Sequence, residues 1–216
     1  MSRATHDDWG SPYQQTISLL LILGGSLVVI CYVTFHESKR AEELIRSKLE
    51  FEDFASCYQV KIKNIWADNE VYIAKPFQDS CACSQQNLTF CAVGAHWQNG
   101  IMEWLIGSIT QCALTILLHA MSWWPSIVLE NMWTFAICHA VTFHNGSIWR
   151  SKPKSPYKLF TGQLPPWSIN GFRAFGCPDC MLKKKLQGGD SFSKWKARGW
   201  QGMHVGQSSC HVSSIP

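Results

Sequence analysis

The sequence predicts an α/β layered domain, because segments typical of strands alternate with segments typical of helices. Residues 60–68 alternate apolar and charged side chains, as a half-buried strand does, and residues 87–93 form a second short strand pattern. Residues 75–86 place Pro76 near a first helical turn, and residues 101–121 repeat apolar side chains at helical spacing. The predicted order is two strands, helix, strand, helix, strand and two helices, followed by a β-rich segment.

Three further segments complete this order. Residues 37–56 place apolar side chains near helical spacing, with charges on the other face. A second long helical pattern opens at Pro125 and ends near the His-Asn-Gly at 144–146, and residues 155–162 form a short helix or turn that ends in glycine. After these, residues 166–216 change to short strands, glycines and lysines, which predicts a small basic β-rich segment.

One segment, residues 16–35, supports two interpretations. It has 20 residues and no charge, which is long enough for a helix that spans a bilayer. The flanking charges are acidic before it and basic after it, and they would place the C-terminal part on the cytoplasmic side: Asp7, Asp8, Lys39, Arg40. In the other interpretation, Gly24-Gly25 interrupts the run and two buried strands form from its β-branched residues. A single-pass membrane protein with a repurposed cytoplasmic domain is therefore an alternative function.

Composition restricts the class of protein only loosely. Charged residues make up 16% of the 216, against about 25% in an ordinary soluble domain. The formal net charge of +4 permits nucleic-acid binding without requiring it. The ten cysteines are scattered through apolar runs and show no disulfide pattern. We therefore expect reduced thiols in an intracellular protein.

Two carboxylates stand where a metal site can form. Asp68 ends a predicted strand, and Glu103 begins a predicted helix 35 positions later. An acid at the carboxyl edge of a strand and an acid at a helix N-terminus can converge, and Mg²⁺ prefers such oxygen ligands. The same residues also have a plain structural explanation, because Asp68-Asn69 favours a turn and Glu103 favours the helix dipole.

Eight blocks of the sequence resemble, in the right order, the integrase region of a copia-type LTR-retrotransposon polyprotein. They run from about Gly24 to about Ser209 and read GGSLVV, SKLEFEDFA, VKIKNIWADN, LTFCAVGAHWQNGIMEW, LLHAM, SPYKLFTG, FRAFGCP and KWKARGWQGMHVGQSS. The most specific part is ADN followed by GAHWQNG and a glutamate three positions later. The resemblance implies an integrase catalytic core over residues 24–165, truncated and degenerate, after an unmatched segment over residues 1–23.

The resemblance implies an RNase H-like fold, which is a five-stranded mixed sheet with helices on both sides. It also implies that DNA ends are trimmed and joined at an Asp, Asp, Glu triad that holds Mg²⁺ or Mn²⁺. Asp68 matches the second aspartate and Glu103 matches the glutamate, so both are implied catalytic residues and metal ligands. Gln98, Asn99 and Gly100 match the mobile loop beside the site and are implied DNA contacts. The same resemblance implies DNA as a partner and a homo-oligomeric state. It also implies a nuclear location if the protein is functional.

The sequence departs from this family at three points. No aspartate stands on a strand well before GGSLVV, so the first strand and the first acid of the triad are missing. The polar turn between the second and third strands is lost, which creates the apolar run at 16–35. No Lys or Arg occurs from Ile101 until Arg150, although phosphate contacts supply most sequence-independent DNA affinity. We therefore expect weak DNA binding and no strand transfer.

One other segment has the composition of a nucleic-acid surface. Its cations are Lys183, Lys184, Lys185, Lys194, Lys196 and Arg198. They either contact DNA or form an ordinary solvated face.

Cysteine and histidine spacing predicts no zinc site. Cys177 and Cys180 form a CxxC without a second pair at zinc spacing. His119, His139 and His144 stand on helical patterns among apolar neighbours, which is typical of core or surface histidines rather than ligands.

Overall fold

The computed structural model describes most of the chain between residues 14 and 179. The described residues are 14–18, 21–23, 26–28, 30–36, 38, 40–67, 72–90, 100–125, 128–148, 153–166, 173–179 and 202–203. The chain divides into two compact units: unit 1 is Met1–Ser108 with His144–Pro165, and unit 2 is Ile109–Phe143 with Pro166–Pro216.

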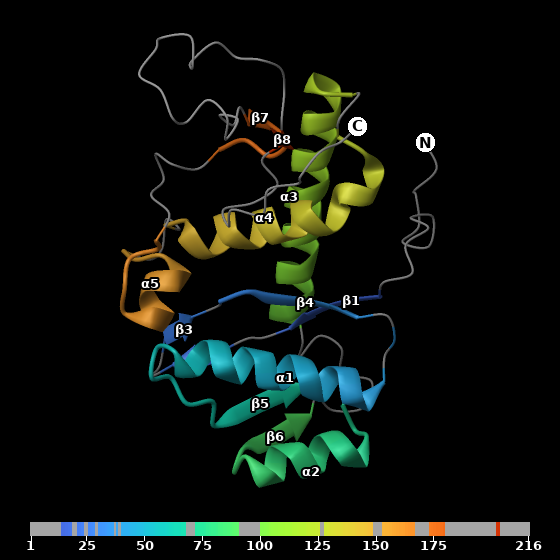
Figure 1. The fold of residues 1–216 in the computed structure, drawn as a ribbon. Helices are drawn as coiled ribbons and strands as arrows, with labels where there is room; N and C mark the ends of the chain where they lie inside the picture. Colours follow the sequence, from blue (N-terminus) through green and yellow to red (C-terminus); the bar gives the residue numbers. More distant parts are fainter. Residues whose placement is uncertain are drawn as a thin grey trace, which may run out of the picture. The chain divides into compact units, whose positions relative to one another are not determined.

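Helices and strands alternate along the chain as the sequence predicts. In chain order, with the labels of Figure 1, they are β1 (Gln14–Ser18), β2 (Leu21–Leu23), β3 (Ser26–Val28), β4 (Tyr32–His36), α1 (Ala41–Ser56), β5 (Asn64–Ala67), α2 (Lys75–Cys83), β6 (Asn87–Phe90), α3 (Gly100–Trp123), η3 (Glu130–Met132), α4 (Trp133–Gly146), α5 (Pro156–Thr161), β7 (Pro178–Asp179) and β8 (Gly202–Met203).

The apolar run at 16–35 forms strands. β1 pairs antiparallel with β4, with Gln14 opposite His36, and β2 pairs antiparallel with β3. Apart from residues 30 and 31, every described residue between 16 and 35 lies in one of these four strands. The alternative prediction of a membrane-spanning helix at 16–35 is therefore wrong for the described residues. The strand prediction gave two strands, whereas the structure has four shorter ones. The physical reason is the β-branched composition, which favours extended backbone.

Helix α1 begins at Ala41 rather than at residue 37. Glu42 and Glu43 stand in its first turn, where negative charge favours the helix dipole. The residues buried along one face are Leu44, Ser47, Lys48, Phe51 and Ala55. The helix ends before Gln59, whose positive φ of 60° turns the chain back toward β5.

A strand, a helix and a strand follow α1, and the two strands are parallel. β5 pairs with β6 with Ile65 opposite Leu88, and α2 lies between them in the chain. Ile65 and Ala67 are buried while the alternate residues of β5 are exposed, which is the period of two expected for a half-buried strand. β5 begins at Asn64, so residues 60–63 of the predicted strand 60–68 precede it; residue 68 and residues 91–93 of the predicted strand 87–93 lie outside the described residues.

One apolar core joins these elements in unit 1. Its buried members are Ile30, Leu44, Phe51, Ala55, Ile62, Ile65, Phe77, Cys81 and Phe160. Helix α5 contributes Phe160, whose ring stacks on Phe54 with the centroids 6.0 Å apart. Ser155 caps α5 by accepting a hydrogen bond from the Lys158 N–H, and Gly162 ends it with a φ of 74°. The short helix predicted at 155–162 is thereby confirmed.

A side-chain amide connects the strands of unit 1 to the end of α4. Asn145 Oδ1 accepts from the Cys31 N–H at 2.9 Å, and Asn145 Nδ2 donates to the Cys31 carbonyl at 2.8 Å. The amide thus satisfies both backbone groups of Cys31, as a neighbouring strand would.

His36 forms a buried polar cluster at the end of β4, with 2% of the residue exposed. Its Nε2 lies 3.0 Å from Thr34 Oγ1 and 2.9 Å from Ser47 Oγ, and its Nδ1 lies 3.4 Å from Glu43 Oε2. Ser38 donates to the same carboxylate through its N–H and its hydroxyl. The cluster therefore fixes β4 against the first two turns of α1.

Unit 2 contains most of helices α3 and α4, and Gly176 packs closely against Ala120 and Val128. Along α3 the buried side chains within this unit recur at helical spacing: Ile109, Ala113, Leu117 and Ala120. The helix predicted to open at Pro125 starts later, as η3 followed by α4. Of the predicted β-rich segment at 166–216, the structure describes residues 166, 173–179 and 202–203, which include the short antiparallel pair β7 and β8; the remainder lies outside the described residues.

Helix α3 is long and apolar. Among the described helices, its part Met102–Trp123 has the length and composition to cross a membrane, with 28% of the relevant window buried. The core helix of a soluble protein can have the same composition, so this property alone assigns no location.

We predict that Gly176→Ala destabilises unit 2 by about 1–3 kcal/mol. Gly176 has a φ of +75°, and an added Cβ would lie 2.9 Å from Val128 Cγ2 and 3.1 Å from Ala120 Cβ. The matched control is Gly107→Ala in α3, where a Cβ meets no atom within 4 Å and helix propensity favours alanine. Thermal unfolding followed by circular dichroism measures both variants. Equal melting temperatures would contradict the packing described here.

A second prediction concerns pH. Burial lowers the pKa of His36, and the Glu43 carboxylate opposes this only in part. The unfolded chain, with a histidine pKa of about 6.5, then binds the proton more readily than the folded chain. The contribution of His36 to stability is thus complete above about pH 6.5 and is lost as the pH falls through the lowered folded-state value.

Urea unfolding of wild type and His36→Gln, at a series of pH values across this window, measures the effect. The substitution should flatten the loss of stability on acidification. A wild-type slope retained in His36→Gln would contradict the prediction.

Candidate functional site

The candidate site is built around Glu103, in the first turn of α3. The helix begins at Gly100, and Glu103 is exposed on it. A carboxylate at this position faces the positive end of the helix dipole and several N–H groups without intrahelical partners. An added Cβ at Gly100 would meet no atom within 4 Å, so packing of the described residues does not require glycine there.

The other predicted site residues lie outside the described residues. These are Asp68, Gln98, Asn99, Lys183, Lys184, Lys185, Lys194, Lys196 and Arg198. Of the predicted site, the structure therefore describes Gly100 and Glu103, which share the first turn of α3. The convergence of Asp68 with Glu103 stays a prediction.

The two strands that precede α3 in the chain are described. Because β5 and β6 are parallel and in register from Asn64–Asn87 to Ala67–Phe90, their carboxyl ends lie at the same edge of the pair. Asp68 follows Ala67 directly in the sequence, and α3 is the next described element after β6. This is the order of elements on which the sequence prediction of a shared site depends.

The described residues do not fit a complete metal site. Within them, no group of three or more His, Cys, Asp and Glu side chains could hold a metal ion. Of the two candidate acids, the structure describes Glu103 and not Asp68. A two-metal site that holds Mg²⁺ needs several oxygen ligands. We therefore derive no chemical step through a metal from this geometry.

Three of the described cysteines and histidines belong to the protein interior or to local contacts: Cys31, His139 and His119. Burial raises the pKa of the Cys31 thiol to about 12, which makes it an inert core side chain. His139 packs edge-on against Phe175 at 5.7 Å between centroids, and the exposed His119 accepts a hydrogen bond from the Trp123 indole. Cys177 is half-buried, and its CxxC partner, Cys180, lies outside the described residues.

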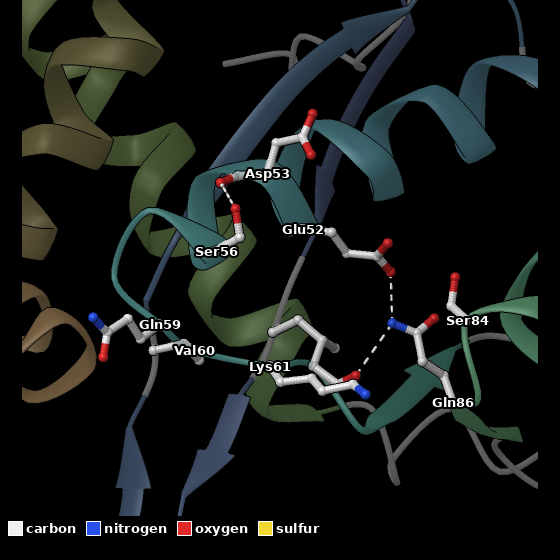
Figure 2. A pocket seen from close by; sticks show the side chains of 9 residues that line it. Glu52, Asp53, Ser56, Gln59, Val60, Lys61, Ser84 and Gln86 are labelled. Atoms are coloured by element: carbon white, nitrogen blue, oxygen red, sulfur yellow. Dashed lines mark hydrogen bonds between the residues drawn. The ribbon is translucent and has the colours of Figure 1, made fainter.

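A polar network in unit 1 was not predicted from the sequence. Lys48 is buried, and its Nζ lies 2.9 Å from Glu52 Oε1 and 3.1 Å from Ser84 Oγ. The same Glu52 oxygen accepts from the amide of Gln86, which also donates to the Ile62 carbonyl, as Figure 2 shows. The one available signal was the i, i+4 spacing of Lys48 and Glu52.

This network borders a pocket of about 460 Å³. Its walls are the last turns of α1, residues 59–62, Ser84 and Gln86 (Figure 2). Glu103 is not among the residues that line it. Its charges are mixed, with Glu52, Asp53 and Lys61 on the walls, so the pocket does not select one sign of ligand.

Comparison with known proteins finds likeness in structure alone. No family model matches the chain, and no curated protein matches it significantly. A chain of the simian T-cell lymphotropic virus intasome, solved in complex with a PP2A regulatory subunit, is 19% identical with a TM-score of 0.49. The match covers 71% of this chain and spans 55% of the length of the intasome chain.

Two retroviral integrase catalytic core domains are also similar. The HTLV-2 domain, solved with magnesium, is 16% identical with a TM-score of 0.48, over 68% of this chain and 94% of that one. The BIV domain is 11% identical with a TM-score of 0.44, over 68% and 91%. The likeness is one of mixed helix and sheet at low identity; a copia-type origin and a truncation stay predictions from the sequence.

The buried ion pair gives a stability prediction. Lys48→Met should destabilise unit 1 by about 2 kcal/mol or more, because it leaves Glu52 without its cation and removes the donor to Ser80 and Ser84. The matched control is Arg46→Met, which removes an exposed i, i+4 pair at 3.7 Å and should cost less than about 0.5 kcal/mol. Urea unfolding measures both. Equal losses would show that burial of the Lys48 pair is not important.

Proposed function

We propose that this chain is an integrase-core-like fragment of a retrotransposon polyprotein, which binds nucleic acid weakly and does not join DNA ends. The observation that carries the proposal is the ordered series of sequence blocks, with the glutamate of GAHWQNGIMEW in the first turn of a long helix. That helix follows a strand, a helix and a second, parallel strand, which is the order that the sequence patterns predict. DNA is the proposed partner and a nuclear location the proposed setting.

Loss of activity is part of the proposal. The acid that would complete the triad has no match in the sequence, so Asp68 and Glu103 would hold at most one Mg²⁺ or Mn²⁺, and weakly. A two-metal arrangement, which would stabilise both the attacking and the leaving oxygen, needs more carboxylates than these two. When bound, one ion would supply local positive charge for a phosphate. No zinc is proposed.

Weak DNA affinity follows from the charge of α3. The helix has no Lys or Arg along Gly100–Trp123, so it offers no cation to a phosphate backbone beside Glu103. The basic residues of 183–198 would then supply most of the electrostatic attraction. Binding should therefore fall with salt according to the number of those cations engaged.

The two acids can be tested together. Titration with Mn²⁺, followed by water-proton relaxation, should show weak binding that Asp68→Asn and Glu103→Gln each remove, because both acids would contact one ion. Glu42→Gln, which changes an acid in the first turn of α1, is the matched control and should retain binding. Loss with only one of the two site variants would contradict a shared site.

The same protein should be assayed on a DNA end. With one acid missing, no trimming or strand transfer is expected in Mg²⁺ or Mn²⁺. Processing that depends on the metal and disappears in Glu103→Gln would overturn the loss of activity. Absence of both DNA binding and Mn²⁺ binding would remove the integrase-core proposal altogether.

A further inference from the structure

Trp104 directly follows Glu103 on α3, and its side chain is open to solvent. The residue is 62% exposed, and its ring makes no hydrogen bond or ring contact with the described residues. Trp123, near the other end of α3, is equally exposed at 66%, but its indole N–H donates to His119 Nε2 at 2.9 Å. The two tryptophans therefore differ, because the indole of Trp123 is hydrogen-bonded to His119 and the indole of Trp104 has no such bond within the described residues.

The charge around Trp104 restricts the partner that it fits. Glu103 is the only Asp, Glu, Lys or Arg residue of α3. Its negative charge repels phosphates. A nucleic acid could then gain affinity at this turn through the face of a base and not through its backbone. Stacking on an aromatic ring serves any base, because every base has a π face.

We propose that Trp104 is a stacking platform for an unpaired base of single-stranded nucleic acid, beside the candidate acid Glu103. This rests on the proposed function, because it gives the substrate class of the same site. An unpaired base is required because bases inside a duplex are stacked on one another and do not present a free face. The exposed indole of Trp104 can offer one face to such a base.

The test is binding of a fluorescein-labelled oligothymidylate, measured by anisotropy at low salt in EDTA. Trp104→Ala should weaken binding roughly tenfold, within the about 5- to 150-fold range of a lost base–aromatic stack, and Trp104→Phe should retain most of the affinity. Trp123→Ala is the matched control and should bind as wild type does. A duplex of the same length should be insensitive to Trp104→Ala.

A site-specific signal supports the same experiment. In protein labelled with 5-fluorotryptophan, the fluorine resonance that is absent from Trp104→Phe should shift when the oligonucleotide is added. Melting temperatures of the variants should match that of wild type, because an exposed side chain is changed.

Three outcomes would overturn the inference. These are equal affinity of Trp104→Ala and wild type, an equal loss in Trp123→Ala, and a change in self-association rather than in oligonucleotide binding. The last outcome would assign the exposed indole to a contact between copies. The oligonucleotide assay contains EDTA and therefore does not depend on divalent ions. Failure of Mn²⁺ to bind at Asp68 and Glu103 would count against the proposed function, but it would not produce any of these three results.

Discussion

The parallel pairing of β5 and β6 is the constraint on which the candidate site depends. Parallel strands need a crossover, which α2 provides, and they bring both carboxyl ends to one edge. The pair is held by burial of Ile65 against the core that includes Phe51 and Ala55 of α1. If this register slipped by one residue, Ile65 and Ala67 would leave the core, so the apolar pattern fixes the register. Ala67, the last residue of β5, is fixed with it.

Helices were easier to predict from the sequence than strands. The pattern over 101–121 became α3, within two residues at each end, because a long apolar period outweighs local propensity. The run at 16–35 was ambiguous because length and lack of charge describe a membrane helix and a set of buried strands equally well. Pairing of β1 with β4 decides between them, and composition does not show which strand pairs with which.

Sequence motifs and charges predicted the position of Glu103 in the candidate site, but they did not predict side-chain contacts or exposure. The sequence places Glu103 at the start of a helix, and the structure has it in the first turn. The contacts of Lys48 with Ser80 and Ser84 were not predictable, because these residues are 32 and 36 positions apart and share no pattern. The exposure of Trp104 was equally hidden, since the sequence does not say which face of α3 is covered.

The proposed site, in which Asp68 and Glu103 together hold one cation, can be examined in a crystal structure determined with Mn²⁺, because an anomalous difference map locates the ion. We expect a peak about 2.1 Å from a carboxylate oxygen of each residue, so that these two oxygens lie within about 4 Å of one another. Carboxylates too far apart to share an ion, with no peak between them, would contradict it.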